Sequence, residues 1–190
     1  PKRINNSGLM LGSQALFDEQ TYTPIEGPAS ASLVRTEFED LNNVGQVVGW
    51  WDESMPANHV YFPTNSHGLL RETDGALRGI DWAYLWPESK VLPPGYPAYG
   101  ITVHLIHSLG TKVKGINDHG EVIAIASAAY EGTRPDGTQM YHVESVYGIG
   151  RPERSARTSQ GTGETFLEPT LIDPRPKPVT GVAEPRAREY

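Results

Sequence analysis

Apolar residues in the first 150 positions occur in short runs separated by polar, glycine-containing turns. Most runs are rich in β-branched and aromatic residues, and their length suits strands better than helices. The pattern therefore predicts an all-β fold of repeated antiparallel hairpins, and only residues 15–20 are allowed as a short helix. The clearest predicted strands are Val47–Trp51, Val60–Phe62, Tyr84–Trp86, Ile101–Ile106 and Val122–Ala126.

A short phrase occurs three times: Ile or Leu, then Asn, then Asn or Asp, one further residue, Gly, and apolar residues after it. The copies begin at residues 4, 41 and 116, so the second interval is about twice the first. Asn and Asp bond their own main chain in turns, and Gly adopts positive φ at little steric cost. Each copy therefore predicts a strand, a tight turn and a strand. The spacing is typical of propellers and solenoids. Thr73–Gly75 and Pro135–Gly137 predict two further hairpin turns.

One copy of this phrase, Asn43–Gly49, is followed by a longer pattern at His67–Asp81. Together they resemble the HAF-type repeats of predicted extracellular proteins, and the resemblance extends over about residues 4–126. It implies propeller-like blades of four strands, an extracellular or surface-associated location and no general activity. The residues alone leave a second architecture open, a β-sandwich that carries the same turns.

The composition changes near residue 150. Residues 151–190 hold seven basic and six acidic side chains, whereas residues 1–150 hold nine basic and seventeen acidic ones. Prolines at positions 152, 169, 174, 176, 178 and 185 favour extended chain over regular structure. We therefore predict a β-repeat domain at 1–150 and an extended C-terminal arm at 151–190. The arm is either poorly ordered or ordered by a protein partner or another copy of the chain.

Charge and composition exclude several classes of function. The formal net charge of −7 disfavours a nucleic-acid partner, and no apolar run is long enough for a membrane-spanning helix. The absence of cysteine excludes disulfides and thiolate sites. His104 and His107 fall on opposite faces of a strand, so no metal is expected there. Gly148–Gly150 and Gly161–Gly163 lack the third glycine of a phosphate-binding loop, so no cofactor is expected.

Candidate catalytic residues are the acids and histidines that the turns do not account for. They are Asp52, Glu53, Asp81, His59 and His67. Acid–base catalysis needs two such groups to converge in one cleft. Convergence would favour a secreted glycan-active hydrolase or lyase with its site at the end of a blade.

Aromatic residues are the candidate binding residues, in two short segments. These are Trp50 and Trp51, and Trp82, Tyr84 and Trp86. Strand alternation puts Trp50 and Trp51 on opposite faces. An exposed indole could stack on a glycan or anchor a protein partner, or the rings could be buried between blades.

The function predicted from these patterns is a non-enzymatic structural or binding module. It would belong to an extracellular or surface assembly and make protein contacts through its blade faces and the arm at 151–190. The glycan-active enzyme is the alternative.

Overall fold

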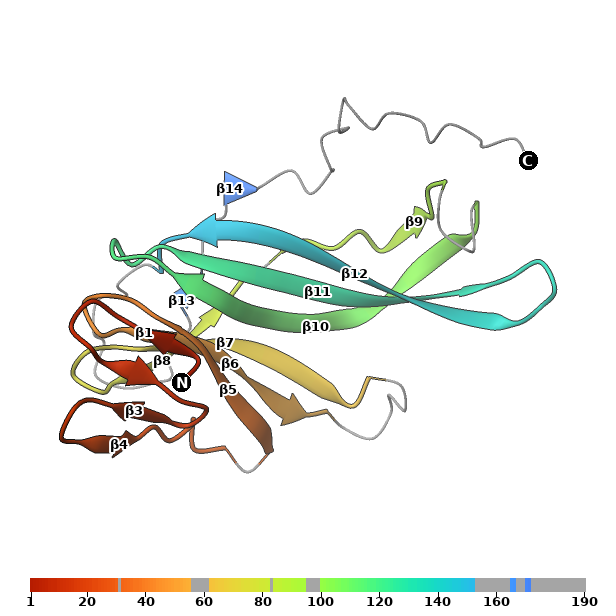
Figure 1. The fold of residues 1–190 in the computed structure, drawn as a ribbon. Coiled ribbons are helices and arrows are strands. Elements are labelled where there is room, and N and C mark those ends of the chain that lie inside the picture. The colour runs from red at the N-terminus through yellow and green to blue at the C-terminus, as the bar shows by residue number, and fades with distance from the viewer. Residues whose placement is uncertain are drawn as a thin grey trace, which may run out of the picture.

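The computed structural model describes residues 1–30, 32–55, 62–82, 84–94 and 100–152, and the backbone of 165–166 and 170–171. Every regular element in these residues is a strand, which confirms the all-β prediction. The described residues include no helix that could cross a membrane. Their strands form a four-stranded and a ten-stranded sheet, and neither closes into a barrel or a propeller (Figure 1).

The four-stranded sheet is a meander at the N-terminus. Its strands are β1 (Arg3–Ile4), β2 (Met10–Leu11), β3 (Ala15–Phe17) and β4 (Tyr22–Pro24). Residues 15–20, allowed above as a short helix, instead contain β3 and the following turn. The Asp18 carboxylate accepts backbone hydrogen bonds from Gln20 and Thr21 at 2.9 and 2.7 Å. Such local bonding favours a turn over a helix.

The large sheet begins with four consecutive antiparallel strands. They are β5 (Leu33–Leu41), β6 (Val47–Ser54), β7 (Thr64–Arg71) and β8 (Leu77–Asp81). The predicted turn at Thr73–Gly75 joins β7 to β8, with the Gly75 amide bonded to the Glu72 carbonyl at 3.0 Å. The predicted run Val60–Phe62 falls mostly outside the described residues.

The sheet continues in three longer strands and several short ones. The long strands are β10 (Thr102–Ile116), β11 (Val122–Thr133) and β12 (Gln139–Gly150); β9 (Ser89–Val91), β13 (Thr165–Phe166) and β14 (Thr170–Leu171) pair with β10, β8 and β12. A single parallel pairing of Gly110 with Ser66 joins β10 to β7. The predicted strand at Tyr84–Trp86 is absent, because Pro87 follows directly and cannot donate to a ladder.

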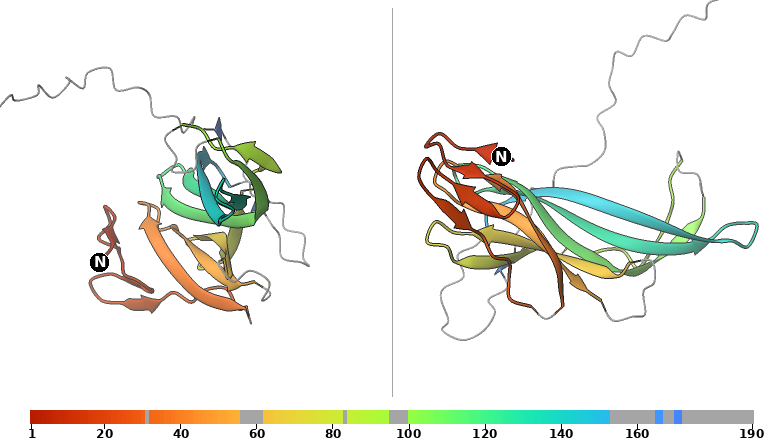
Figure 2. Two further views of the ribbon diagram at one scale, coloured as in Figure 1. Left: turned by 90° about the vertical axis from the view of Figure 1, so that its right-hand side faces the viewer. Right: turned by 60° about the horizontal axis from the view of Figure 1, so that its bottom comes forward.

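The chain is layered around β5–β8. The N-terminal sheet lies against one side of these strands, and β10–β12 lie on the other (Figure 2). One apolar cluster fills each interface: Leu11, Phe38 and Leu69 belong to the first, Val48 and Val113 to the second. The β11–β12 hairpin extends beyond both layers (Figure 1).

The three repeated phrases form equivalent turns. Their glycines, at positions 8, 45 and 120, have φ angles of 84°, 88° and 75°. Each glycine amide bonds the carbonyl of the Asn three residues earlier, at 3.1, 3.1 and 3.0 Å. The prediction of three strand–turn–strand units is therefore confirmed.

The three turns also stack side by side. Asn5 Nδ2 donates to the Asn42 carbonyl at 3.2 Å, and Asn42 Nδ2 donates to the Asn117 carbonyl at 3.1 Å. A second series runs parallel to it, because the Asn43 amide bonds Asp118 Oδ1 at 2.8 Å. Two bonds from Asn43 to this carboxylate hold the pKa of Asp118 below its ordinary value. The stack fixes the relative positions of the N-terminal sheet, β5–β6 and β10–β11.

Candidate functional site

Three of the candidate catalytic residues meet on one face of β6–β8. His67 stands between two carboxylates, with Nδ1 3.0 Å from Asp81 Oδ2 and Nε2 4.0 Å from Glu53 Oε2. The Trp51 indole stacks on the imidazole, at 4.9 Å between ring centroids and 22° between planes. The hairpin registers explain this arrangement, because Trp51 lies directly opposite His67 and Gly68 opposite Ile80. Cross-strand neighbours on one face are in contact distance.

The environment keeps Glu53 ionised. A hydrogen bond from the Ser30 hydroxyl holds the pKa of Glu53 below its ordinary value; burial opposes this, and Trp51 Nε1 adds a bond of 3.3 Å. Glu53 and Asp81 both contact the His67 imidazole, so their carboxylates are less than about 10 Å apart. Paired catalytic carboxylates are separated by distances up to about this value. All three side chains are partly exposed. The described residues include no group of three or more His, Asp or Glu side chains suited to a metal ion.

The other two candidates do not join this cluster. Asp52 points to the opposite face of β6, where it accepts bonds from Ser66 Oγ at 2.6 Å and Arg35 Nε at 3.1 Å. Only 7% of its side chain is exposed, and Lys112 Nζ lies 3.8 Å away. Asp52 is therefore a buried, fully paired carboxylate between the layers. His59 lies outside the described residues.

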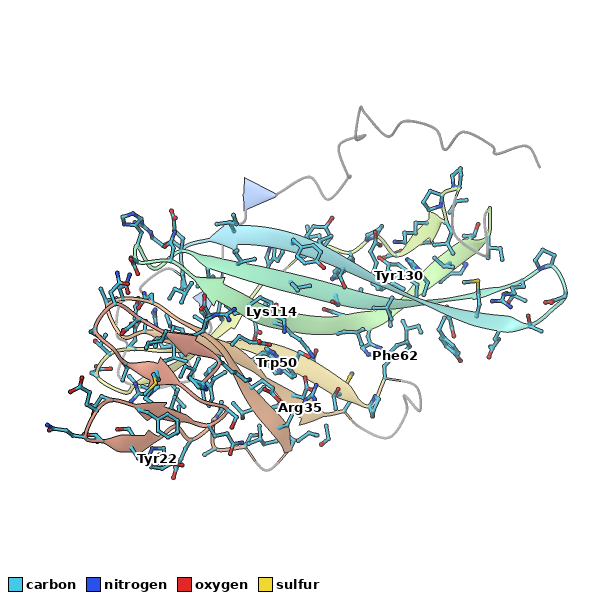
Figure 3. The ribbon with its side chains drawn as sticks, viewed as in Figure 1. Tyr22, Arg35, Trp50, Phe62, Lys114 and Tyr130 are labelled. Atoms are coloured by element: carbon cyan, nitrogen blue, oxygen red, sulfur yellow. The ribbon has the colours of Figure 1, made fainter. Side chains whose placement is uncertain are left out.

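Trp50 and Trp51 face opposite sides of the sheet, as alternation predicts. Three cations surround the Trp50 ring, with Lys112, Arg35 and Lys114 at 3.6, 4.5 and 5.3 Å from its centroid. Trp50, Arg35 and Lys114 are labelled in Figure 3. Burial lowers the pKa of Lys112. The Trp50 indole is only 5% exposed, so it is not an open stacking surface.

Glu39 completes the surroundings of Trp50. It accepts a bond from Trp50 Nε1 at 2.8 Å and pairs with Lys114. Burial would raise the pKa of Glu39, but the bonds from Lys114 and Trp50 outweigh it and lower the pKa. The three cations are thus partly neutralised by Glu39 and Asp52, and the group joins β5 and β6 to β10.

The second aromatic segment covers the inner side of β10–β12. Trp82 is 5% exposed and packs into the cluster between the layers. Tyr84 and Trp86 are half-buried, and edge-to-face contacts connect the three rings at 5.8 and 4.6 Å. A Cβ on Gly148 would come within 2.5 Å of the Trp82 ring, so this glycine makes room for the indole.

The opposite side of β11 and β12 exposes apolar side chains. We call the side formed by their odd-numbered residues the outer face. Its exposed apolar residues are Ile123, Tyr141, Val143, Tyr147 and Ile149, each between 37% and 48% exposed. The even-numbered residues of β12 are buried or half-buried, with His142, Val146 and Gly148 buried. Sequence reasoning missed this surface because β12 carries apolar residues on both of its faces.

The backbone of β12 is open along much of one side. The backbone amide of Arg134 donates to the Thr138 carbonyl at 2.9 Å, so these two even-numbered residues face each other as a bonded pair. The next residues along, Thr133 and Gln139, lie opposite each other. Antiparallel alternation then directs the amides of even-numbered β12 residues to β11 and those of odd-numbered residues away from it. On that far side β14 pairs with Gly148 and Ile149 alone. The rest, 139–147, carries no strand of the described part of the chain, and we call it the open edge.

One hollow borders the outer face, and another lies at the stacked turns. One, of about 280 Å³, lies between β7 and the outer face and is lined by residues that include Phe62, Gly110, Lys112 and Val143. The Phe62 ring contacts His107 and Tyr141 edge-on, at 5.9 and 6.0 Å. The other, of about 670 Å³, lies at the stacked turns. Neither is lined by Glu53, His67 or Asp81.

Comparison of the chain with protein-family models, curated proteins and solved structures finds no match.

Proposed function

We propose that this protein is a non-enzymatic structural module that joins a protein assembly by adding a partner's β-strand to the open edge of β12. The observation that carries this proposal is the coincidence of that edge with the exposed apolar outer face. Main-chain bonds to an added strand supply affinity, and side chains alternating on one face supply specificity. Apolar side chains exposed as a contiguous group are typical of interaction surfaces.

The edge also lacks the features that block strand addition in other proteins. Soluble proteins commonly protect edge strands with lysine, proline or bulges. Strand β12 pairs with β11 without a bulge and contains neither lysine nor proline. Its one charged side chain, Glu144, pairs with Lys90 on the inner side. An added strand would therefore meet no charge at the edge itself.

Several broader features belong to the same proposal. The equivalence of the three stacked turns supports their origin as copies of one repeat that resembles the HAF type. A blade arrangement, an extracellular or surface-associated location and a second contact through the arm at 151–190 are part of this proposal. Glycan binding at Trp51 also belongs here, because its indole is the partly exposed member of the Trp50–Trp51 pair.

The test uses a fluorescent strand peptide, Thr-Tyr-Thr-Val-Thr-Val-Thr-Tyr-Thr, and anisotropy with the full chain. We expect saturable binding that Ser145→Pro weakens at least about tenfold, because proline removes an edge donor and leaves the backbone bonds to β11 in place. The substitution also removes the 2.8 Å bond between the Ser145 and Ser127 hydroxyls, which lies within the chain and not at the edge. Val44→Lys, in an exposed turn far from the edge, is the control and should leave binding unchanged. Absence of binding at protein concentrations where the chain is monomeric, or equal binding by Ser145→Pro, would contradict the proposal.

A second candidate function is favoured by the cluster around His67. Two carboxylates on either side of an imidazole, beside an indole, are the groups that a glycan-active hydrolase or lyase uses. Incubation with a panel of polysaccharides and measurement of released reducing ends tests it. Activity that is lost in both Glu53→Gln and Asp81→Asn, and retained in Asp52→Asn, would establish the enzyme. No release from any substrate would remove the support for it.

A further inference from the structure

We infer that the strand added to β12 is β12 of a second copy of this chain, paired antiparallel about a two-fold axis. This inference rests on the proposed function and names its partner. A two-fold axis places the same patch on both sides of the contact, so the patch must complement itself. The open edge meets this requirement in hydrogen bonding, in register and in charge.

Hydrogen bonding restricts how two copies can pair. Only odd-numbered residues of β12 direct their amides to the open edge. The two strands therefore bond only when odd-numbered residues stand opposite odd-numbered residues. Directly opposite residues project from the same face of a sheet. The outer faces of the two copies would thus form one continuous apolar surface, with Val143 and Tyr147 of both chains on it.

The length of the open edge selects one register. β14 occupies Gly148 and Ile149, so a second copy can pair along 139–147. The pairing that uses all of this edge places Val143 opposite Val143 of the second copy. Tyr141 then stands opposite Ser145 of the second copy, and Gln139 opposite Tyr147. Each bonded pair contributes a donor and an acceptor from both chains.

The chain's own C-terminal sequence is unsuited to the same position. In the register of β14, Leu171 lies opposite Gly148 and Thr170 opposite Ile149. A continuation of that register would set Pro174, Pro176 and Pro178 opposite Ser145, Val143 and Tyr141. These are the odd-numbered positions, where an N–H is needed and proline has none. The open edge is therefore better matched by β12 of another copy than by the residues that follow β14.

Charge does not oppose the pairing. Near the two-fold axis the acidic and imidazole side chains of β12 are those of Glu144 and His142. Burial and the neighbouring Lys90 lower the pKa of His142, which keeps the imidazole neutral at pH 7. Glu144 is paired with Lys90 on the inner side. The nearest cation on the outer side is Lys112, which shares the small hollow with Val143. No like charges therefore meet at the axis.

Analytical ultracentrifugation of the full chain over a wide concentration range is the first test. We expect a monomer–dimer equilibrium in the wild type. Ser145→Pro removes an edge donor, and Val143→Lys brings two ammonium groups together at the axis. Each should weaken the dimer at least about tenfold, while Val44→Lys should not. Far-UV circular dichroism shows whether the variants keep the β fold.

A single-cysteine variant tests the register. The chain contains no cysteine, so any disulfide joins two copies. Bonded antiparallel neighbours have Cα atoms about 5.5 Å apart, within the range of a disulfide. Val143→Cys should therefore form a covalent dimer on mild oxidation. Val34→Cys, equally exposed on β5, should remain monomeric under the same conditions.

The outcomes separate this inference from the proposed function. A chain that is monomeric at every concentration but binds the strand peptide would overturn the inference and leave the proposed function standing. A dimer that is insensitive to both Ser145→Pro and Val143→Lys would overturn the inference. Loss of both dimerisation and peptide binding in Ser145→Pro supports both. A wild-type chain that neither dimerises nor binds the peptide would overturn both.

Discussion

The side-chain amide of Asn42 donates a 3.1 Å hydrogen bond to the carbonyl of Asn117, 75 residues later in the chain. The Oδ1 atom of the same side chain accepts a hydrogen bond from the backbone N–H of Gln46 at 2.9 Å, within its own turn. One residue therefore shapes a hairpin and attaches it to another. Asn117 is the last in the stack, and its Nδ2 donates to Glu121 of its own turn at 2.7 Å.

Asn42→Asp tests the connection between turns. The substitution keeps the acceptor within the turn but replaces the donor with an oxygen that faces the Asn117 carbonyl and Gln46 Oε1. Because Asn42 is 3% exposed, we expect a loss of about 1–3 kcal/mol in the free energy of unfolding, measured with urea. Asn117→Asp makes the same chemical change at an exposed site and should cost about 0.5 kcal/mol or less. Equal losses of unfolding free energy in the two variants would show that the bond between the turns does not contribute to stability.

Gly148→Ala tests the packing of Trp82. Its new Cβ would lie 2.5 Å from the indole and force the ring to move. We expect a loss of about 1–3 kcal/mol and a changed near-UV circular dichroism spectrum. Gly115→Ala is the control, because the nearest atom to its Cβ is 3.4 Å away and no positive φ is required there. An unchanged near-UV spectrum in Gly148→Ala would contradict the predicted contact.

Asp52→Ala tests the charged group between the layers. The substitution leaves Lys112 and Arg35 against the Trp50 ring without their buried carboxylate. We expect a loss of about 2–3 kcal/mol in urea unfolding, at or below the lower end of the range for broken buried pairs, because both cations are partly exposed. Glu53→Ala changes the neighbouring carboxylate on the more exposed face and should cost less. A larger loss of unfolding free energy in Glu53→Ala than in Asp52→Ala would show that Glu53, and not Asp52, is the structurally important carboxylate.

The turns could be predicted from the sequence because their chemistry is local. The bonds of Asn42 to Gln46 and the positive φ of Gly45 depend on residues within one phrase. Alternation likewise places Trp50 and Trp51 on opposite faces. The meeting of His67 with Asp81 follows from the β7–β8 register, which the turn at Thr73–Gly75 indicates.

The arrangement of layers could not be predicted in the same way. The contact of Asn42 with Asn117 joins segments far apart in the chain, and nothing within either phrase specifies it. In β12, Val146 and Tyr147 are both apolar, and only the packing of Trp82 against Gly148 decides which face is covered. The proposed interaction surface is the face left exposed by that choice.

His142 predicts a specific dependence of stability on pH. Burial, followed by the charge of Lys90, lowers its pKa in the folded state from the ordinary 6.5. Below pH 6.5 the unfolded chain therefore binds a proton that the folded chain resists. The stabilisation is complete above pH 6.5 and is lost as the pH falls toward the folded-state pKa, by at most about 1.4 kcal/mol per pH unit.

Urea unfolding of the wild type and His142→Gln between pH 8 and pH 5 isolates this contribution, because titration of the carboxylates is common to both. Both measurements are made in the Ser145→Pro background, so the proteins compared are Ser145→Pro with and without His142→Gln. Dissociation of a dimer then does not add to the signal. The stability difference should shift in favour of His142→Gln as the pH falls. A difference between wild type and His142→Gln that stays constant over this range would mean that burial does not disfavour the imidazolium, and that the inner side of β12 admits water.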